Sequence, residues 1–127
     1  MFTKLFMLNY LMKYFVMILS MILAVLGQFL FKKGVVLTNV SPNIKSIISS
    51  IFTPTLFFGF ICYGVSAVLW LFVLKKFPLS VAYPSLAFTY ILVLLISVIF
   101  FNESLSIFKI FGVILIFSGV VLINIQK

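Results

Sequence analysis

The sequence feature that most constrains the fold is a continuous apolar run over residues 79–100 that contains Pro84. A hydrocarbon core about 30 Å thick is crossed by roughly 20 apolar residues in a helix, so this run is long enough to span a bilayer. Proline lacks an N–H and its ring crowds the preceding turn, so we expect the helix to kink or open there. Backbone groups freed in hydrocarbon need polar partners. We therefore expect residues 80–90 to face protein or a wet cavity and to line a pathway.

The composition places the whole chain in the membrane. Of 127 residues, 65% are hydrophobic and 8% are charged, whereas soluble domains are about half apolar and about a quarter charged. Three more apolar runs, at about 14–31, 55–74 and 107–125, accompany the run at 79–100. The sequence therefore predicts an all-α membrane protein with four transmembrane helices, in a single domain over residues 1–127.

The inventory of charged and reactive side chains excludes several function classes. The nine cationic residues are all lysines, Glu103 is the single acid, and the net charge is +8. This balance favours anionic headgroups or phosphate-bearing ligands, and no soluble basic face exists to bind nucleic acid. There is no histidine, and Cys62 is the only cysteine. We therefore expect no metal site, no cofactor and no enzymatic activity.

Polar residues near the end of the first run are candidates for ligand binding. Gln28 and Lys32 stand four residues apart and share one helix face, while Lys33 points about a hundred degrees away. Gln28 could bond either a ligand or a neighbouring helix. Lys32 and Lys33 could bind a phosphate or extend to the lipid headgroups.

A second group of candidates lies in the middle of the chain. Trp70, one turn before the end of the second run, suits either ligand stacking or the interfacial aromatic belt. Tyr83 and Ser85 flank Pro84 and supply neutral hydrogen-bonding groups. Small residues in the second run, including Gly59 and Ser66, should let another helix approach closely.

The connections between the runs carry helix-capping signals. Ser41-Pro42 predicts an N-cap and first residue of a short amphipathic helix that ends near Thr53-Pro54. The polar turn over residues 102–106 offers three caps for the last run, and Glu103 suits the positive end of that helix. In the last run, Gly112 and Gly119 lie two turns apart and form a stripe for close packing. Either the other spans or a second protomer could use it.

Residues 15–125 resemble the EamA-type, small-multidrug-resistance-like branch of the drug/metabolite transporter superfamily. The resemblance rests on sequence segments distributed along the chain: Gly27-Gln28 with Lys32, Leu69 to Leu74 around Trp70, Ala82-Tyr83-Pro84, Asn102 to Ser106, and Gly112 to Ile116. Within this branch the chain is most similar to the aminoarabinose-phosphoundecaprenol flippase subunits.

The resemblance implies a four-helix protomer that works as a dimer, often in inverted or dual orientation. Helices 1–3 would line the pathway, and helix 4, with Gly112 and Gly119, would make the dimer contact. The resemblance also carries site positions onto Gln28, Lys32, Tyr83 and Pro84. Small multidrug exporters have a glutamate in the middle of their first helix, and alignment on Gly27 places Ala24 there, which argues against proton-coupled cation export.

These observations predict a small transporter of the bacterial inner membrane, homodimeric or paired with a similar subunit. It would flip a polyprenyl-phosphate-linked sugar, or a related anionic lipid, by alternating access. Lys32 with Lys33 would bind phosphate, Gln28, Tyr83 and Ser85 would bind sugar hydroxyls, and Pro84 would act as the hinge. Two alternatives are an exporter of hydrophobic cations whose acid comes from a partner chain, and a non-transporting assembly subunit of a membrane glycosyltransferase.

Overall fold

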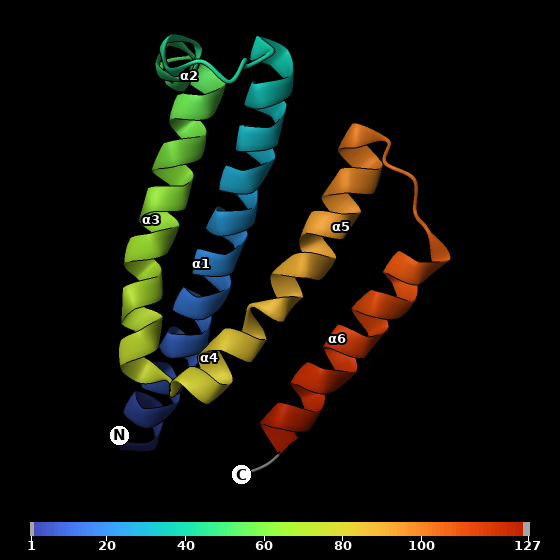
Figure 1. Ribbon diagram of the computed structural model, residues 1–127. Coiled ribbons are helices and arrows are strands. Elements are labelled where there is room, and N and C mark those ends of the chain that lie inside the picture. The colour runs from blue at the N-terminus through green and yellow to red at the C-terminus, as the bar shows by residue number, and fades with distance from the viewer. Residues whose placement is uncertain (1, 126–127) are drawn as a thin grey trace. The chain divides into compact units, whose positions relative to one another are not determined.

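The computed structural model describes residues 2–125, with side chains from Met7 to Ile123 and for Ile125. Every regular element within this range is an α-helix: α1 (Phe2–Thr38), α2 (Ile44–Ile51), α3 (Pro54–Lys76), α4 (Leu79–Ser85), α5 (Ala87–Phe101) and α6 (Ile107–Ile125) (Figure 1). The chain forms two compact units, Met1–Leu71 and Phe72–Lys127. The prediction of an all-helical protein is therefore confirmed.

The first helix, α1, is much longer than the predicted span at 14–31, because it includes residues on both sides of that span, among them those after Gly34. The apolar pattern continues through Val35, Val36 and Leu37, and a glycine inside a helix weakens it without ending it. The helix ends where Asn39 takes a left-handed backbone conformation with φ 44°. Asparagine tolerates that conformation better than most residues, so it is a suitable stop.

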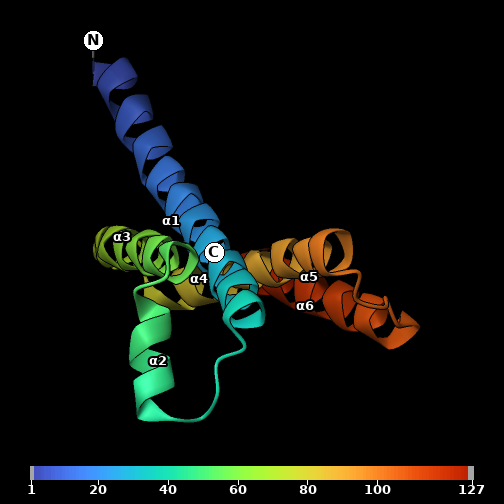
Figure 2. The same cartoon turned by 90° about the horizontal axis from the view of Figure 1, so that it is seen from above.

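The predicted short amphipathic helix is confirmed as α2, but its cap differs from the prediction. The side chain of Asn43, not of Ser41, accepts the N–H of Lys45 at 3.3 Å. The Ser41 N–H instead donates to the hydroxyl of Ser46 at 3.2 Å. The cap therefore lies two residues later than predicted, and α2 lies crosswise at one end of the α1–α3 pair (Figure 2).

Helices α1 and α3 pack closely because glycines remove the side chains between them. A Cβ built on Gly27 would lie 3.1 Å from the backbone oxygen of Gly59 and 3.0 Å from the Cβ of Tyr63. A Cβ on Gly34 would lie 2.6 Å from the Cγ of Leu56. The prediction that small residues of the second span permit close approach is confirmed at Gly59, whereas Gly64 has no atom within 4 Å of such a Cβ among the described residues.

In the second unit the apolar run breaks beside its proline, as predicted. Helix α4 ends at Ser85, Leu86 follows, and α5 begins at Ala87. The Leu86 N–H donates to the carbonyl of Tyr83 at 3.0 Å, and the Thr89 hydroxyl donates to the carbonyl of Leu86 at 2.6 Å. These local hydrogen bonds thus replace part of the backbone hydrogen bonding that is lost at the break. Within a membrane, a break in a helix requires such replacement.

The last helix, α6, returns beside α4 and α5 with the bounds predicted for the fourth span. Asn102 ends α5 in a left-handed conformation with φ 49°. Of the three capping residues proposed for the following turn, Ser106 supplies the cap, since its hydroxyl accepts the Phe108 N–H at 3.3 Å. Glu103 lies four residues before Ile107, outside the first helical turn.

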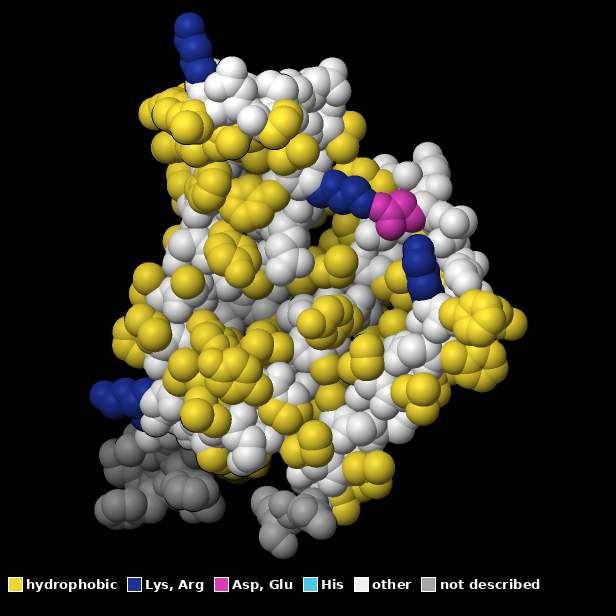
Figure 3. Space-filling model, viewed as in Figure 1, with side chains coloured by type: hydrophobic (Ala, Val, Ile, Leu, Met, Phe, Trp, Pro, Cys, Tyr) yellow, Lys and Arg dark blue, Asp and Glu magenta, His cyan; other side chains and the backbone are white. Residues whose placement is uncertain are grey.

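The surface and the helix lengths are those of a multi-pass membrane protein. Met7–Thr38, Pro54–Lys76 and Leu79–Phe101 are each long and apolar enough to cross a bilayer, and Ile107–Ile123 is a shorter apolar helix. Many large apolar side chains are exposed, which a soluble monomer would avoid. Figure 3 shows these side chains spread over the visible face, with few charged groups among them.

Candidate functional site

Three of the predicted ligand-binding residues lie exposed on one stretch of α1. Gln28 and Lys32 are one turn apart, and Lys33 is displaced around the helix. The neighbouring Gly27 faces α3, where it approaches Tyr63 and the backbone of Gly59. Among the described residues no hydrogen bond joins the Gln28 amide to another helix.

The angular order of residues around α1 divides its surface into three adjacent strips. At about 100° per residue, and measured from Phe31, Val35 lies about 40° around the axis, and Gln28 and Lys32 lie about 60° and 100° around. Gly27 and Gly34 lie about 40° and 60° in the other direction. Around the axis of α1, the side that contacts α3 (Gly27 and Gly34) is thus followed by an apolar strip (Phe31 and Val35) and then by a polar strip (Gln28 and Lys32).

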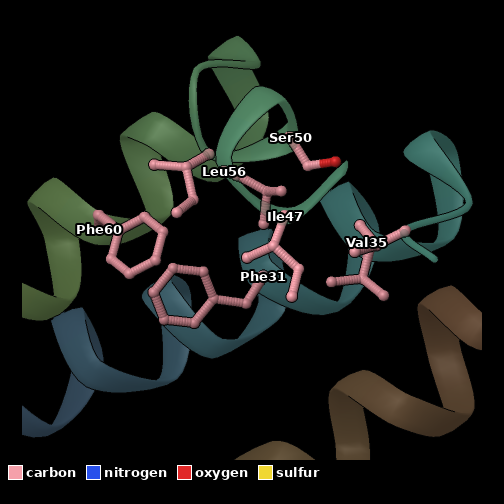
Figure 4. A pocket seen from close by; sticks show the side chains of 8 residues that line it. Phe31, Val35, Ile47, Ser50, Leu56 and Phe60 are labelled. Carbon is pink, nitrogen blue, oxygen red and sulfur yellow. The ribbon is translucent and has the colours of Figure 1, made fainter. Parts of the chain in front are cut away.

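The apolar strip forms one wall of a pocket that the sequence analysis did not identify. The pocket has a volume of about 230 Å³ and lies between α1, α2, the start of α3 and the loop before α2 (Figure 4). Its lining is Phe31 and Val35 of α1, Val40 of the loop, Ile47, Ser50 and Ile51 of α2, and Leu56 and Phe60 of α3. All of these side chains are apolar except Ser50. The spacing of Ile47 and Ile51 on an amphipathic helix was the one available sequence signal.

Aromatic contacts shape the inner wall of this pocket. The ring of Phe31 lies 4.7 Å from the ring of Phe60 and 5.9 Å from the ring of Tyr63, measured between centroids and tilted in both cases. Such offset pairs are worth about 0.5–1.5 kcal/mol beyond the area that they bury. They hold Phe31 in place between the pocket and the α1–α3 interface.

The remaining predicted residue of the first unit is Trp70. It is half-buried and stands six residues before the end of α3 at Lys76. Gln28 and Lys32 lie together on one face of α1, the other long helix of this unit. Trp70 lies on α3 and is not part of that face.

In the second unit, the residues next to Pro84 differ in their exposure and in the hydrogen-bonding groups that they can offer to a ligand. Tyr83 is 55% exposed, so its ring and hydroxyl are accessible. Ser85 is 6% exposed, and its hydroxyl donates to the carbonyl of Val81 at 2.7 Å. The Ser85 donor is therefore used within α4, and only its oxygen lone pairs remain for a ligand. Pro84 lies in the last turn of α4, directly before the break.

Around the two glycines of α6, the described residues leave open space for a side chain. A Cβ built on either Gly112 or Gly119 would meet no atom of α4 or α5 within 4 Å. Among the described residues, the glycines at close helix contacts are therefore Gly27 and Gly34 of α1 and Gly59 of α3. The stripe on α6 is not used by the helices of its own unit.

The sequence of this chain resembles known proteins along most of its length. Residues 2–125 match the sequence profile of the EamA-like transporter family. The probable 4-amino-4-deoxy-L-arabinose-phosphoundecaprenol flippase subunit ArnE of Aeromonas salmonicida is 32% identical over 108 residues, which cover 85% of this chain and 93% of that protein. The subunit named ArnF of Erwinia tasmaniensis is 38% identical over 111 residues, covering 82% and 87%.

A third relative extends the match to nearly the whole length of both chains. The probable subunit ArnE of Escherichia fergusonii is 31% identical over 113 residues, which cover 89% of this chain and 97% of that protein. With four other relatives of these two names, the match covers between 49% and 66% of their own length. No solved structure matches this chain.

Proposed function

We propose, from the premise that this chain belongs to the EamA-like transporter family, that it is a subunit of a flippase for polyprenyl-phosphate-linked sugars. The observation that carries the proposal is the match with subunits named as probable aminoarabinose-phosphoundecaprenol flippases over most of both chains. The substrate would be an anionic lipid whose sugar-phosphate headgroup crosses the membrane while its tail stays in the hydrocarbon. A bacterial inner membrane is the location that such a substrate requires.

The side chains of α1 support an anionic substrate over a cationic one. Residues 14–31 contain no carboxylate, and Ala24 stands in the middle of this stretch. Proton-coupled exchange of a cation normally needs an ionisable acid within the membrane. Lys32 instead offers positive charge at the rim, where a phosphate can approach it from the headgroup layer.

We infer four membrane crossings. Lys13 and Lys32 stand 19 positions apart on α1, a rise of about 28 Å, which is close to the hydrocarbon thickness. Helix α6 has 19 residues and the same length. An even number of crossings would put both termini on one side of the membrane. The rest of α1 would extend beyond the hydrocarbon or tilt within it.

The pathway that we propose uses polar residues of α1 and the residues around the proline break. Lys32, helped by Lys33, would attract the phosphate, and Gln28 and Tyr83 would exchange hydrogen bonds with sugar hydroxyls. The interrupted helix at Pro84 would let α4 move against α5 during alternating access. Trp70 would stack on the sugar, and Ser85 would contribute as an acceptor.

The assembly that we propose is a dimer, either of two copies or with a similar subunit. Gly112 and Gly119 leave a smooth strip on α6 that its own unit does not cover. Close approach through small residues is the usual way in which helices associate in lipid. The relatives carry two different subunit names, which favours a partner similar to this chain over a second copy.

The test is a flipping assay in liposomes that contain the purified chain, alone or together with a second subunit of the family. A labelled undecaprenyl-phosphate sugar is added, and an impermeant reagent counts the headgroups in each leaflet. We expect protein-dependent flipping that Lys32→Ala abolishes and that Lys75→Ala, a matched loss of charge at the end of α3, leaves intact. A folded chain that flips nothing in either arrangement would overturn the proposal.

A further inference from the structure

We infer that the apolar pocket between α1, α2 and α3 binds the part of a polyprenyl phosphate tail that lies next to the phosphate. The inference rests on the proposed function, because it takes its ligand from that class of substrate. It assigns a place to the hydrocarbon of the substrate, whereas the polar residues described above concern only its headgroup. Its basis is the chemistry, size and position of the pocket.

The lining selects a hydrocarbon ligand. Seven of its eight residues are aliphatic or aromatic, and Ser50 alone carries a polar side chain. No charged side chain is part of the wall. A polar headgroup in this pocket would lose its hydrogen bonds to water without replacement, which is costly. A hydrocarbon loses none and gains contact with branched and aromatic side chains.

The volume suits a short length of one chain. At about 230 Å³ the pocket is larger than a cavity of about 150 Å³, which is already enough to hold benzene. It therefore has room for one or two isoprene units but not for the two acyl chains of a phospholipid. Ile47 and Leu56 converge on this space from α2 and α3, opposite Phe31 (Figure 4).

The position of the pocket links it to the phosphate site. On α1, the lining residue Val35 follows Lys32 by one helical turn, a rise of about 4.5 Å, and lies about 60° from it around the axis. The apolar strip is thus adjacent to the polar strip of Gln28 and Lys32. A ligand bound to both must change from phosphate to hydrocarbon within a few bonds.

The need to change from phosphate to hydrocarbon within a few bonds distinguishes polyprenyl phosphates from phospholipids. In a polyprenyl phosphate, the first isoprene carbon is bonded directly to a phosphate oxygen. In a phospholipid, a polar glycerol with two ester groups separates the phosphate from the acyl chains. If Lys32 binds the phosphate, the apolar side chain of Val35 one turn away would contact hydrocarbon in a polyprenyl phosphate. In a phospholipid it would contact the ester groups, which would lose hydrogen bonds to water.

The experiment labels the pocket directly and does not depend on transport. The purified chain in liposomes is mixed with a polyprenyl phosphate that carries a photoreactive diazirine on its first isoprene unit. After illumination, mass spectrometry locates the attachment. We expect labelling within residues 31–60, and we expect Val35→Phe or Val40→Phe, which fill the pocket, to lower it at least fivefold. Val68→Phe, at an exposed position of α3, serves as the matched control and should change nothing.

Competition separates the two lipid sources. Excess unlabelled polyprenyl phosphate should remove the labelling, whereas the same excess of phosphatidylglycerol should not. Equal competition by both lipids, or labelling that both filled variants retain, would overturn the inference. Flipping that continues without pocket labelling would refute the pocket and leave the proposed function standing. Labelling without flipping, both for the chain alone and with a second subunit of the family, would refute the function and leave the pocket.

Discussion

The hydroxyl of Ser66 on α3 donates a hydrogen bond of 2.8 Å to the backbone carbonyl of Ser20 on α1. Both residues are buried, and the Ser20 hydroxyl itself donates to the carbonyl of Met17 at 2.7 Å. This polar contact therefore joins the two long helices of the first unit inside their buried interface. It lies on the same interface as Gly27 and Gly59, so hydrogen bonding and close packing act together.

Removing this bond should destabilise the helix pair. Interhelical hydrogen bonds in membrane proteins average about 0.6 kcal/mol and reach about 2 kcal/mol, so Ser66→Ala should lower the free energy of unfolding by an amount in that range. Unfolding in mixed detergent micelles, followed by circular dichroism, measures the change. Ser118→Ala is the control, because the Ser118 hydroxyl donates to the carbonyl of Ile114 within its own helix. An equal effect of both variants would contradict the structural role of Ser66.

The glycine contact between α1 and α3 should tolerate no large side chain. In Gly27→Leu the new Cβ would meet the backbone of α3 at about 3.1 Å, and the rest of the side chain would force the helices apart. Overpacking of this kind costs about 1–3 kcal/mol. Gly64→Leu places the same side chain in open space on α3 and should leave stability unchanged. The same unfolding experiment compares them, and similar curves would refute the close contact.

The break beside Pro84 should matter more for transport than for folding. Pro84→Ala supplies an N–H that can donate to the carbonyl of Ser80 and so allows α4 to continue into α5. We expect a stability equal to or above that of the original chain, together with flipping about tenfold slower, which corresponds to about 1.4 kcal/mol in the barrier.

Pro54→Ala is the control for this variant. Pro54 is the first residue of α3, where the missing N–H would have no partner within the helix. Flipping assays in liposomes should therefore show no change for Pro54→Ala. A normal rate for Pro84→Ala would exclude the hinge role.

The two neighbouring lysines of α1 should differ in importance. Lys32 shares its face with Gln28 and borders the pocket, whereas Lys33 points about a hundred degrees further around. Lys32→Ala should weaken binding of a polyprenyl phosphate at least tenfold, and Lys32→Arg, which retains the charge, should restore most of it. Lys33→Ala should cost less than threefold. A titration with fluorescent polyprenyl phosphate distinguishes the residues, and a larger effect at Lys33 would reverse their assigned roles.

The exposed strip on α6 should act between chains. Gly119→Leu should leave the unfolding of the single chain unchanged, since no atom of α4 or α5 lies within 4 Å of a Cβ at this position. In the proposed dimer, the same change should separate the helices and lower the dimer fraction seen by crosslinking in liposomes. Ile114→Phe, at an exposed apolar position on the opposite side of α6, is the control and should leave the dimer fraction unchanged. A dimer fraction that Gly119→Leu does not alter would place the contact elsewhere.

Local chemistry was sufficient to predict much of this protein. The apolar runs predicted the long helices and the bounds of α6, and Pro84 predicted the break between α4 and α5, because a missing N–H acts on its own turn in any context. The capping and proline signals between the first two runs predicted α2. The cap of α2 was assigned to Ser41 and not to Asn43, and α1 was ended too early, since several residues could serve as caps or stops and small differences in free energy decide among them.

Tertiary structure decided which of several equivalent small and polar residues are used. Gly27, Gly59 and Gly112 look alike in sequence, yet within the described part of the chain only the first two lie between closely packed helices. Ser85 appeared as available as Tyr83 until its hydroxyl was found bonded to Val81. The pocket depends on side chains from three helices and a loop that are distant in sequence, so no local pattern contains it. Composition and periodicity thus determined the membrane class and the helices, whereas the contacts between helices determined the pocket and the roles of individual residues.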